Sequence, residues 1–62
     1  MRFELPHDPI ILLGIINMNL RDFYPSMALL CEDLELDLES IDRRLKDAGF
    51  FYDVATNQYH PI

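Results

Sequence analysis

Three side chains in this sequence could ligate a soft metal ion: His7, Cys31 and His60. Structural zinc sites usually combine ligands in closely spaced pairs, and these three stand singly and far apart. The acidic residues that alternate over 33–39 have the spacing that opens a calcium-binding loop. That loop needs glycine at its sixth place and glutamate at its twelfth, where this chain has leucine and arginine. We therefore expect neither a metal site nor a cofactor.

Nucleophilic catalysis is not expected either. Ser26 is predicted to cap a helix and Ser40 to lie exposed on one. Cys31 belongs to an apolar helical stripe, where burial keeps a thiol protonated and unreactive. Gly14 and Gly49 stand alone and form no phosphate-binding loop. The sequence predicts no catalytic residue, and we expect that the protein is not an enzyme.

The candidate nucleic-acid contacts are Arg43, Arg44 and Lys46, which lie close together in the sequence. They fall in the second helix of a predicted helix-turn-helix, the helix that enters the major groove in DNA-binding proteins. The whole chain, however, has five basic and eleven acidic residues and a formal net charge of −6. Affinity for nucleic acid comes largely from neutralising phosphates, which requires the opposite balance. A small winged-helix-like DNA-binding regulator is therefore the alternative function, and nucleic-acid binding is not favoured.

A protein-interaction surface is indicated by the helix predicted at about 9–22, which Asp8 and Pro9 should begin. Its apolar side chains cover roughly 220° of the circumference, whereas a surface helix needs an apolar arc of about 100°. We expect the excess to bind a second copy of the chain or another protein partner. The residues predicted to form this surface are Ile11, Leu12, Ile15, Met18 and, on the next helix, Leu29.

Two further helices are predicted at about 27–34 and 38–48, with a turn at 35–37. Apolar residues recur at helical spacing in both segments. Two alternatives compete with this prediction: one unbroken helix carrying a heptad seam, or a strand over the alternating segment LELDLE. We favour two helices, because a turn lets Leu36 face the core.

A β-hairpin is predicted at about 50–60. Residues 53–57 suit a turn closed by Asn57 at positive φ, and Pro61 is expected to end the strand pairing. The aromatic residues expected to close a small core are Phe23, Phe50 and Tyr59. The predicted fold is mainly α (α+β): a three-helix, helix-turn-helix-like bundle with a C-terminal β-hairpin, in a single small domain over 1–62.

Cysteine content and apolar run length indicate the compartment. Cys31, as a single cysteine, cannot form an internal disulfide, which favours a reducing environment. The apolar run from Ile10 to Ile16 is too short to span a bilayer, which takes about 20 residues. Acidic residues precede that run, whereas a signal peptide has a basic leader. We expect a cytoplasmic protein without membrane contact.

Several separated segments carry a resemblance over residues 8–59. They are Asp8-Pro9, Ile16-Asn17, Leu20-Arg21-Asp22, Ser26, Leu30-Cys31, Gly49-Phe50, Tyr52-Asp53 and Asn57-Gln58-Tyr59, in this order. In these segments the chain resembles a family of short bacterial proteins classed as a domain of unknown function and numbered 4250. The resemblance implies a stand-alone bacterial protein with a winged-helix-like fold. It implies no activity, ligand or catalytic residue.

Overall fold

The first helix, α1 (Pro9–Asp22), begins where the sequence predicts. The Asp8 carboxylate accepts hydrogen bonds from the backbone N–H groups of Ile10 (2.8 Å) and Ile11 (3.5 Å), and so satisfies donors that have no partner inside the helix. The computed structural model describes residues 5–62. Residues 1–4 of the predicted single domain lie outside the described residues.

The segment after α1 forms two helices, α2 (Met27–Leu34) and α3 (Leu38–Asp47), so the single-helix and strand alternatives are wrong. The Ser26 hydroxyl caps α2 by accepting from the N–H of Leu29. At the other end Glu35 adopts the left-handed conformation with φ 56°, and the N–H of Leu36 donates to the carbonyl of Cys31 at 2.8 Å. This pattern is a Schellman motif, which ends the helix and turns Leu36 toward the core.

The C-terminal hairpin consists of β1 (Phe50–Asp53) and β2 (Gln58–Pro61), paired antiparallel. Asn57 closes its turn at φ 56°, as the sequence predicts. Pro61 does not end the pairing as expected: it pairs with Phe50, and the N–H of Ile62 donates to the carbonyl of Gly49 beyond it. In an antiparallel ladder, hydrogen-bonded pairs alternate with pairs that exchange no hydrogen bond. Because Gly49 and Ile62 are hydrogen-bonded, the neighbouring pair Phe50–Pro61 is of the second kind, and it does not need the N–H that proline lacks.

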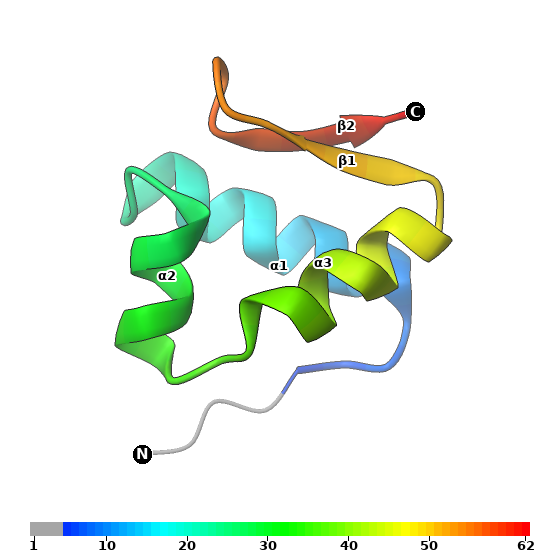
Figure 1. Cartoon of the computed structure of the whole chain (residues 1–62), viewed down its shortest axis with the longest axis horizontal. Helices are drawn as coiled ribbons and strands as arrows, with labels where there is room; N and C mark the ends of the chain where they lie inside the picture. Colours follow the sequence, from blue (N-terminus) through cyan, green and yellow to red (C-terminus); the bar gives the residue numbers. More distant parts are fainter. Residues whose placement is uncertain (1–4) are drawn as a thin grey trace.

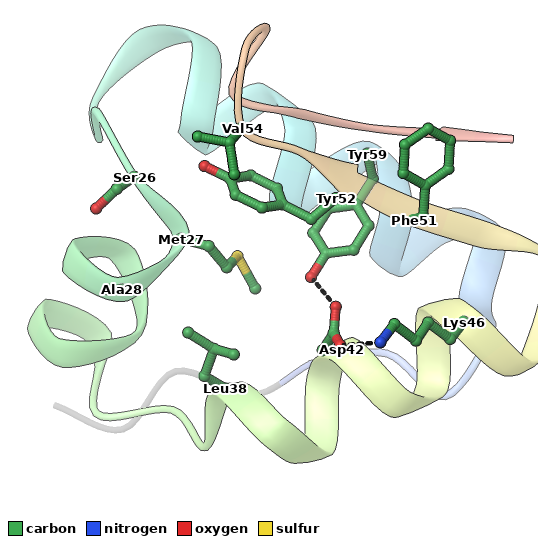
Figure 2. A pocket seen from close by; sticks show the side chains of 10 residues that line it. All are labelled: Ser26, Met27, Ala28, Leu38, Asp42, Lys46, Phe51, Tyr52, Val54 and Tyr59. Atoms are coloured by element: carbon green, nitrogen blue, oxygen red, sulfur yellow. Dashed lines mark hydrogen bonds and ion pairs between the residues drawn. The ribbon is translucent and has the colours of Figure 1, made fainter. Parts of the chain in front are cut away.

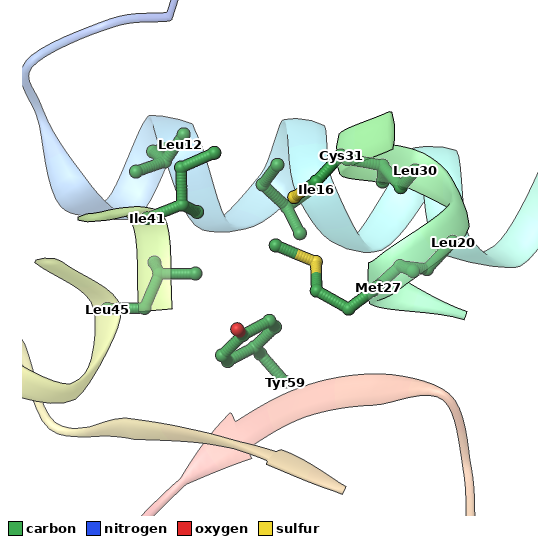
Figure 3. Close-up of a cluster of buried hydrophobic side chains, with 9 residues drawn as sticks. All are labelled: Leu12, Ile16, Leu20, Met27, Leu30, Cys31, Ile41, Leu45 and Tyr59. Atoms are coloured by element: carbon green, nitrogen blue, oxygen red, sulfur yellow. The ribbon is translucent and has the colours of Figure 1, made fainter. Parts of the chain in front are cut away.

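The three helices and the hairpin enclose one apolar core, with β2 against α1 and β1 against α3 (Figure 1). The predicted fold of three helices with a C-terminal β-hairpin is confirmed. The core side chains, drawn in Figure 3, are Leu12, Ile16, Leu20, Met27, Leu30, Cys31, Ile41, Leu45 and Tyr59. Phe23 is not among them: it follows the last residue of α1 and is 70% exposed, and the next residue, Tyr24, packs against the core instead.

Candidate interaction surface

Helix α1 has one buried row and one exposed stripe. Leu12, Ile16 and Leu20 recur at every fourth position and are almost completely buried. Ile11 and Met18 lie on another side of the helix, where 55% and 46% of their surface is exposed. Leu13 also lies outside the buried row, but it packs against the core. We define the α1 stripe as the four apolar side chains on the side of the helix away from the core, together with the glycine between them: Ile10, Ile11, Gly14, Ile15 and Met18.

Two of the residues predicted for the interaction surface do not belong to this stripe. Leu12 is 0% exposed and packs in the core, so its assignment to the surface was wrong. An apolar arc of 220° has no unique inner side, and the wheel alone could not show which side faces α3. Leu29 is exposed, as expected, but it lies on α2 beside the exposed acidic residues Glu32 and Asp33. Ile11, Ile15 and Met18 remain as predicted members of the surface.

Asn17 fixes which side of α1 is covered. Its side-chain oxygen accepts from the N–H of Tyr59 at 2.8 Å, and its side-chain nitrogen donates to the carbonyl of the same residue at 3.0 Å. Gln58 returns a bond from its side chain to the carbonyl of Asn17 at 3.0 Å. The side-chain amide of Asn17 therefore hydrogen-bonds to the free edge of β2 in the same way as the backbone of a neighbouring strand would. The signal in the sequence was an amide in the middle of an aliphatic helix.

Charged groups lie only at the ends of α1. From Pro9 to Leu20 the sequence has no charged residue. Asp8 stands before this span, and Arg21 and Asp22 follow it, joined by a salt bridge of 2.9 Å between Nε and Oδ1. The hydrogen bond from Arg21 lowers the pKa of the exposed Asp22 carboxyl. The α1 stripe is thus an uncharged apolar face on a chain that is otherwise strongly acidic.

The three basic residues predicted as nucleic-acid contacts do not form a free basic patch. Arg44 donates from its guanidinium to the carbonyls of Pro6 (2.7 Å) and His7 (3.1 Å), and so attaches the segment before α1 to α3. Lys46 pairs with Asp42 at 3.3 Å one turn earlier. Arg43 is exposed on α3, where its neighbours include Glu39 and Asp47. A phosphate approaching α3 would meet these carboxylates as well as the cations.

A groove of about 510 Å³ lies between α2, α3 and β1 (Figure 2). Its walls are mostly apolar, and its charged groups, Asp42 and Lys46, are paired with each other. The phenol of Tyr59 donates to the Asp42 carboxylate at 2.8 Å, and burial together with this bond raises the pKa of Tyr59 above its ordinary range. The groove has no histidine or cysteine in its lining, and its serine, Ser26, accepts a helix-capping bond. These groups stabilise the fold and supply no activated nucleophile.

The candidate metal ligands and Cys31 have the following surroundings in the structure. Within residues 5–62 no cluster of three or more histidine, cysteine, aspartate or glutamate side chains is placed to hold a metal ion. Cys31 is buried in the core, as predicted, and burial raises the pKa of its thiol. Among the described helices none has the length and hydrophobicity needed to cross a membrane.

Most of the chain matches a known protein family. The family model described as a domain of unknown function (DUF4250) matches residues 6–59. The chain belongs to this family. The matched span contains all three helices and the whole hairpin turn, and it ends within β2, so the family corresponds to the fold described above. Comparisons with curated proteins and with solved structures found no match.

Proposed function

We propose that this DUF4250 protein is a non-enzymatic protein-interaction module of the cytoplasm, which self-associates through the α1 stripe. The observation that carries the proposal is the uncharged, half-exposed row of aliphatic side chains from Ile10 to Met18. Contiguous apolar patches on small proteins commonly mark interaction sites. The single buried thiol, Cys31, is the argument for a reducing compartment.

A second copy of the chain is the favoured partner, because the α1 stripe complements itself. A chain of net charge −6 repels another copy at long range, and two copies can approach best where neither carries charge. The stripe is the face of α1 that meets this condition. An isologous dimer would cover both stripes in a single contact.

The expected affinity is low. Fully burying an isoleucine or methionine side chain contributes about 1.5–3 kcal/mol. The stripes of two copies hold eight such side chains, and because each is only partly exposed in the monomer, covering it contributes about half of that value, roughly 6–12 kcal/mol in all. Association costs remove a large part of this free energy. We expect a dissociation constant on the order of 0.1 mM. Such a dimer forms where the protein is concentrated or held close to other copies.

Sedimentation velocity from 10 µM to 2 mM tests the proposal, with Met18→Glu as the disrupting variant. Met18 is 46% exposed, so the substitution leaves the core intact and places a carboxylate in the contact. We expect the dissociation constant to rise at least tenfold, the equivalent of about 1.4 kcal/mol. The matched control is Val54→Glu, which makes the same change of charge at an 80% exposed position in the hairpin turn.

The control should dimerise like the wild type. A wild-type protein that stays monomeric at 2 mM would refute self-association. Equal weakening by the two glutamate variants would show that net charge, and not the α1 stripe, governs any association that is seen.

A further inference from the structure

The outer edge of β1 presents backbone groups to the outside of the hairpin. In an antiparallel pair, residues whose N–H and C=O face the neighbouring strand alternate with residues whose groups face away from it. The bond from the N–H of Ile62 to the carbonyl of Gly49 sets this alternation, because Gly49 and Ile62 are then a hydrogen-bonded pair. The N–H and C=O groups of Phe50 and Tyr52 therefore point away from β2.

The second strand has the same alternation. Tyr59 lies opposite Tyr52, and it too directs its N–H and C=O away from the hairpin, where both groups bond to the side chain of Asn17. The edge of β2 is thus satisfied by α1. Within residues 5–62, by contrast, no hydrogen bond engages the outward N–H and C=O groups of Phe50 and Tyr52. Two donors and two acceptors are left on the edge of β1.

No feature of β1 blocks this edge. Soluble proteins commonly protect an edge strand with a proline, a lysine or a β-bulge. The strand Phe50–Asp53 contains neither residue type, and it pairs with β2 in a regular register without a bulge. Its central residue, Phe51, is an aromatic residue that is 40% exposed. An unprotected edge of this kind can pair with an added strand, which is one of the recurring modes of peptide recognition.

The groove of about 510 Å³ lies beside the same edge (Figure 2). Tyr52 lines it from β1, Met27 from α2 and Leu38 from α3. Phe50 and Tyr52 direct their side chains toward the core. Residues of an added strand that pair with these two would have their side chains on the same face of the sheet, which is the face toward the helices. The groove therefore provides apolar contact for every second residue of such a strand.

The position of α3 favours a single strand over a second copy of this chain. Helix α3 packs against β1 (Figure 1), so two copies joined edge to edge would place their α3 helices about as far apart as their β1 strands. Paired strands lie about 4.7–4.9 Å apart, whereas packed helices need about 8–10 Å. An extended segment that brings no helix with it avoids this collision.

Charge indicates what flanks the apolar residues of that segment. Inside the groove Asp42 and Lys46 are paired with each other, and β1 ends on Asp53. The chain as a whole has a formal net charge of −6. A partner segment with basic residues at its ends complements this charge, whereas an acidic segment would be repelled.

From the unpaired edge, the adjoining groove and the charge, we infer that β1 binds an extended segment of another protein as a third, antiparallel strand. The segment has apolar residues at alternate positions, which face the groove, and basic residues at its ends. This site shares no residue with the α1 stripe, so the inference does not depend on self-association.

A seven-residue peptide tests the pairing, with arginine at both ends and three valines alternating with two threonines between them. Its valines face the groove, so their N–H groups face β1, and the N–H groups of its threonines point away. N-methylation of two valines should weaken binding at least tenfold, as measured by NMR titration. N-methylation of the two threonines is the matched control and should leave the affinity within twofold. Glutamate in place of the two arginines should also weaken binding.

Leu38→Lys tests the groove, because it places a cation at a 37% exposed position of its lining. The matched control, Leu29→Lys, makes the same change at a 47% exposed position on α2 outside the groove. The first variant should bind the peptide at least tenfold more weakly than the second. Circular dichroism verifies that both variants are folded, and the methylated peptides test the pairing on the wild type without any substitution.

Amide hydrogen exchange locates the contact. In the free protein the N–H groups of Phe50 and Tyr52 should exchange at least tenfold faster than those of Phe51 and Asp53, which face β2. Peptide at ten times its dissociation constant should slow the two edge amides about tenfold, since exchange then requires dissociation.

Four results would overturn the inference. They are no binding of the unmodified peptide, equal binding of its two methylated forms, equal weakening by the two lysine variants, and edge amides that are already protected in the free protein. Protection of these amides that rises with protein concentration alone would assign the edge to a second copy, and would overturn the inference as well.

Discussion

Replacing Asn17 by aspartate should test whether this side chain holds the hairpin on α1. The side-chain oxygen that accepts from the N–H of Tyr59 at 2.8 Å is retained by the substitution. The nitrogen that donates to the Tyr59 carbonyl at 3.0 Å becomes a second carboxylate oxygen, so two acceptors then face each other. Losing the bond costs about 0.5–1.5 kcal/mol, and leaving a part-buried carbonyl without its donor costs about 1–3 kcal/mol more. We expect Asn17→Asp to lower the free energy of unfolding by roughly 2–4 kcal/mol at pH 7.

The loss should depend on pH, because a protonated carboxyl can donate to the Tyr59 carbonyl again. The carbonyl disfavours the charged form in the folded protein, so the pKa of the introduced carboxyl is raised above its unfolded value of about 3.9. The neutral form is then the one that the fold favours. The penalty is therefore fully present at pH 7 and shrinks as the pH falls through the raised folded-state pKa.

Urea unfolding at pH 7 and pH 4.5, followed by far-UV circular dichroism, measures both effects. Asn17→Ala is the matched control, since it removes both bonds and introduces no titratable group. The free energy of unfolding of Asn17→Asp, relative to that of Asn17→Ala, should be higher at pH 4.5 than at pH 7. The reasoning is refuted if Asn17→Asp stays within about 0.5 kcal/mol of the wild type at pH 7, which is the range of an ordinary surface substitution. It is also refuted if the two variants respond to pH alike.

Two further substitutions test the turn after α2 and the buried phenol. Glu35→Gly should raise the free energy of unfolding by up to about 1 kcal/mol in urea titrations, because Glu35 holds a left-handed φ of 56° that is costly for a residue with a Cβ atom. Tyr59→Phe should make stability less sensitive to alkali, as measured by unfolding between pH 8 and pH 11. Burial raises the pKa of Tyr59, so the wild type loses stability as the pH rises above the unfolded value of about 10, by up to about 1.4 kcal/mol per pH unit.

Each of these predictions has a result that contradicts it. Glu35→Ala keeps the Cβ atom, so a gain in stability as large as that of the glycine variant would show that backbone strain is not the cause. For Tyr59→Phe, the variant should be less stable than the wild type at pH 8, because Asp42 loses the donor 2.8 Å away. An alkaline decline as steep as that of the wild type would assign the titration to other groups.

The sequence predicts the elements of this fold well because their boundaries are set by local chemistry. Asp8 and Ser26 cap their helices, and Asn57 adopts the positive φ that a hairpin turn needs. The ends are less predictable: α3 stops at Asp47, one residue before the predicted end at 48, because Ala48 already has the conformation of a C-cap. These features depend on residues close together in the chain, and spacing alone can reveal them.

The orientation of α1 could not be predicted in the same way, because contacts between distant residues decide it. Leu12 and Ile11 are adjacent aliphatic residues, yet one is in the core and the other is mostly exposed. The contact that distinguishes them joins Asn17 to Tyr59, 42 residues later in the chain. Asn57 adds to it by donating to the carbonyls of Leu20 and Tyr24 near the end of α1. A helical wheel contains none of this information.

The same polar contacts explain why apolar side chains remain exposed on α1. Asn17 accepts from and donates to the backbone of β2, so the hairpin covers α1 along one line and cannot shift toward the stripe without breaking both bonds. The eight residues of α2 and the ten of α3 leave no described helix to cover the other side. The Asn17 side chain therefore both fixes the hairpin on α1 and leaves Ile11 and Met18 exposed. If the α1 stripe binds a second copy, its availability depends on Asn17, a residue that the partner need not touch.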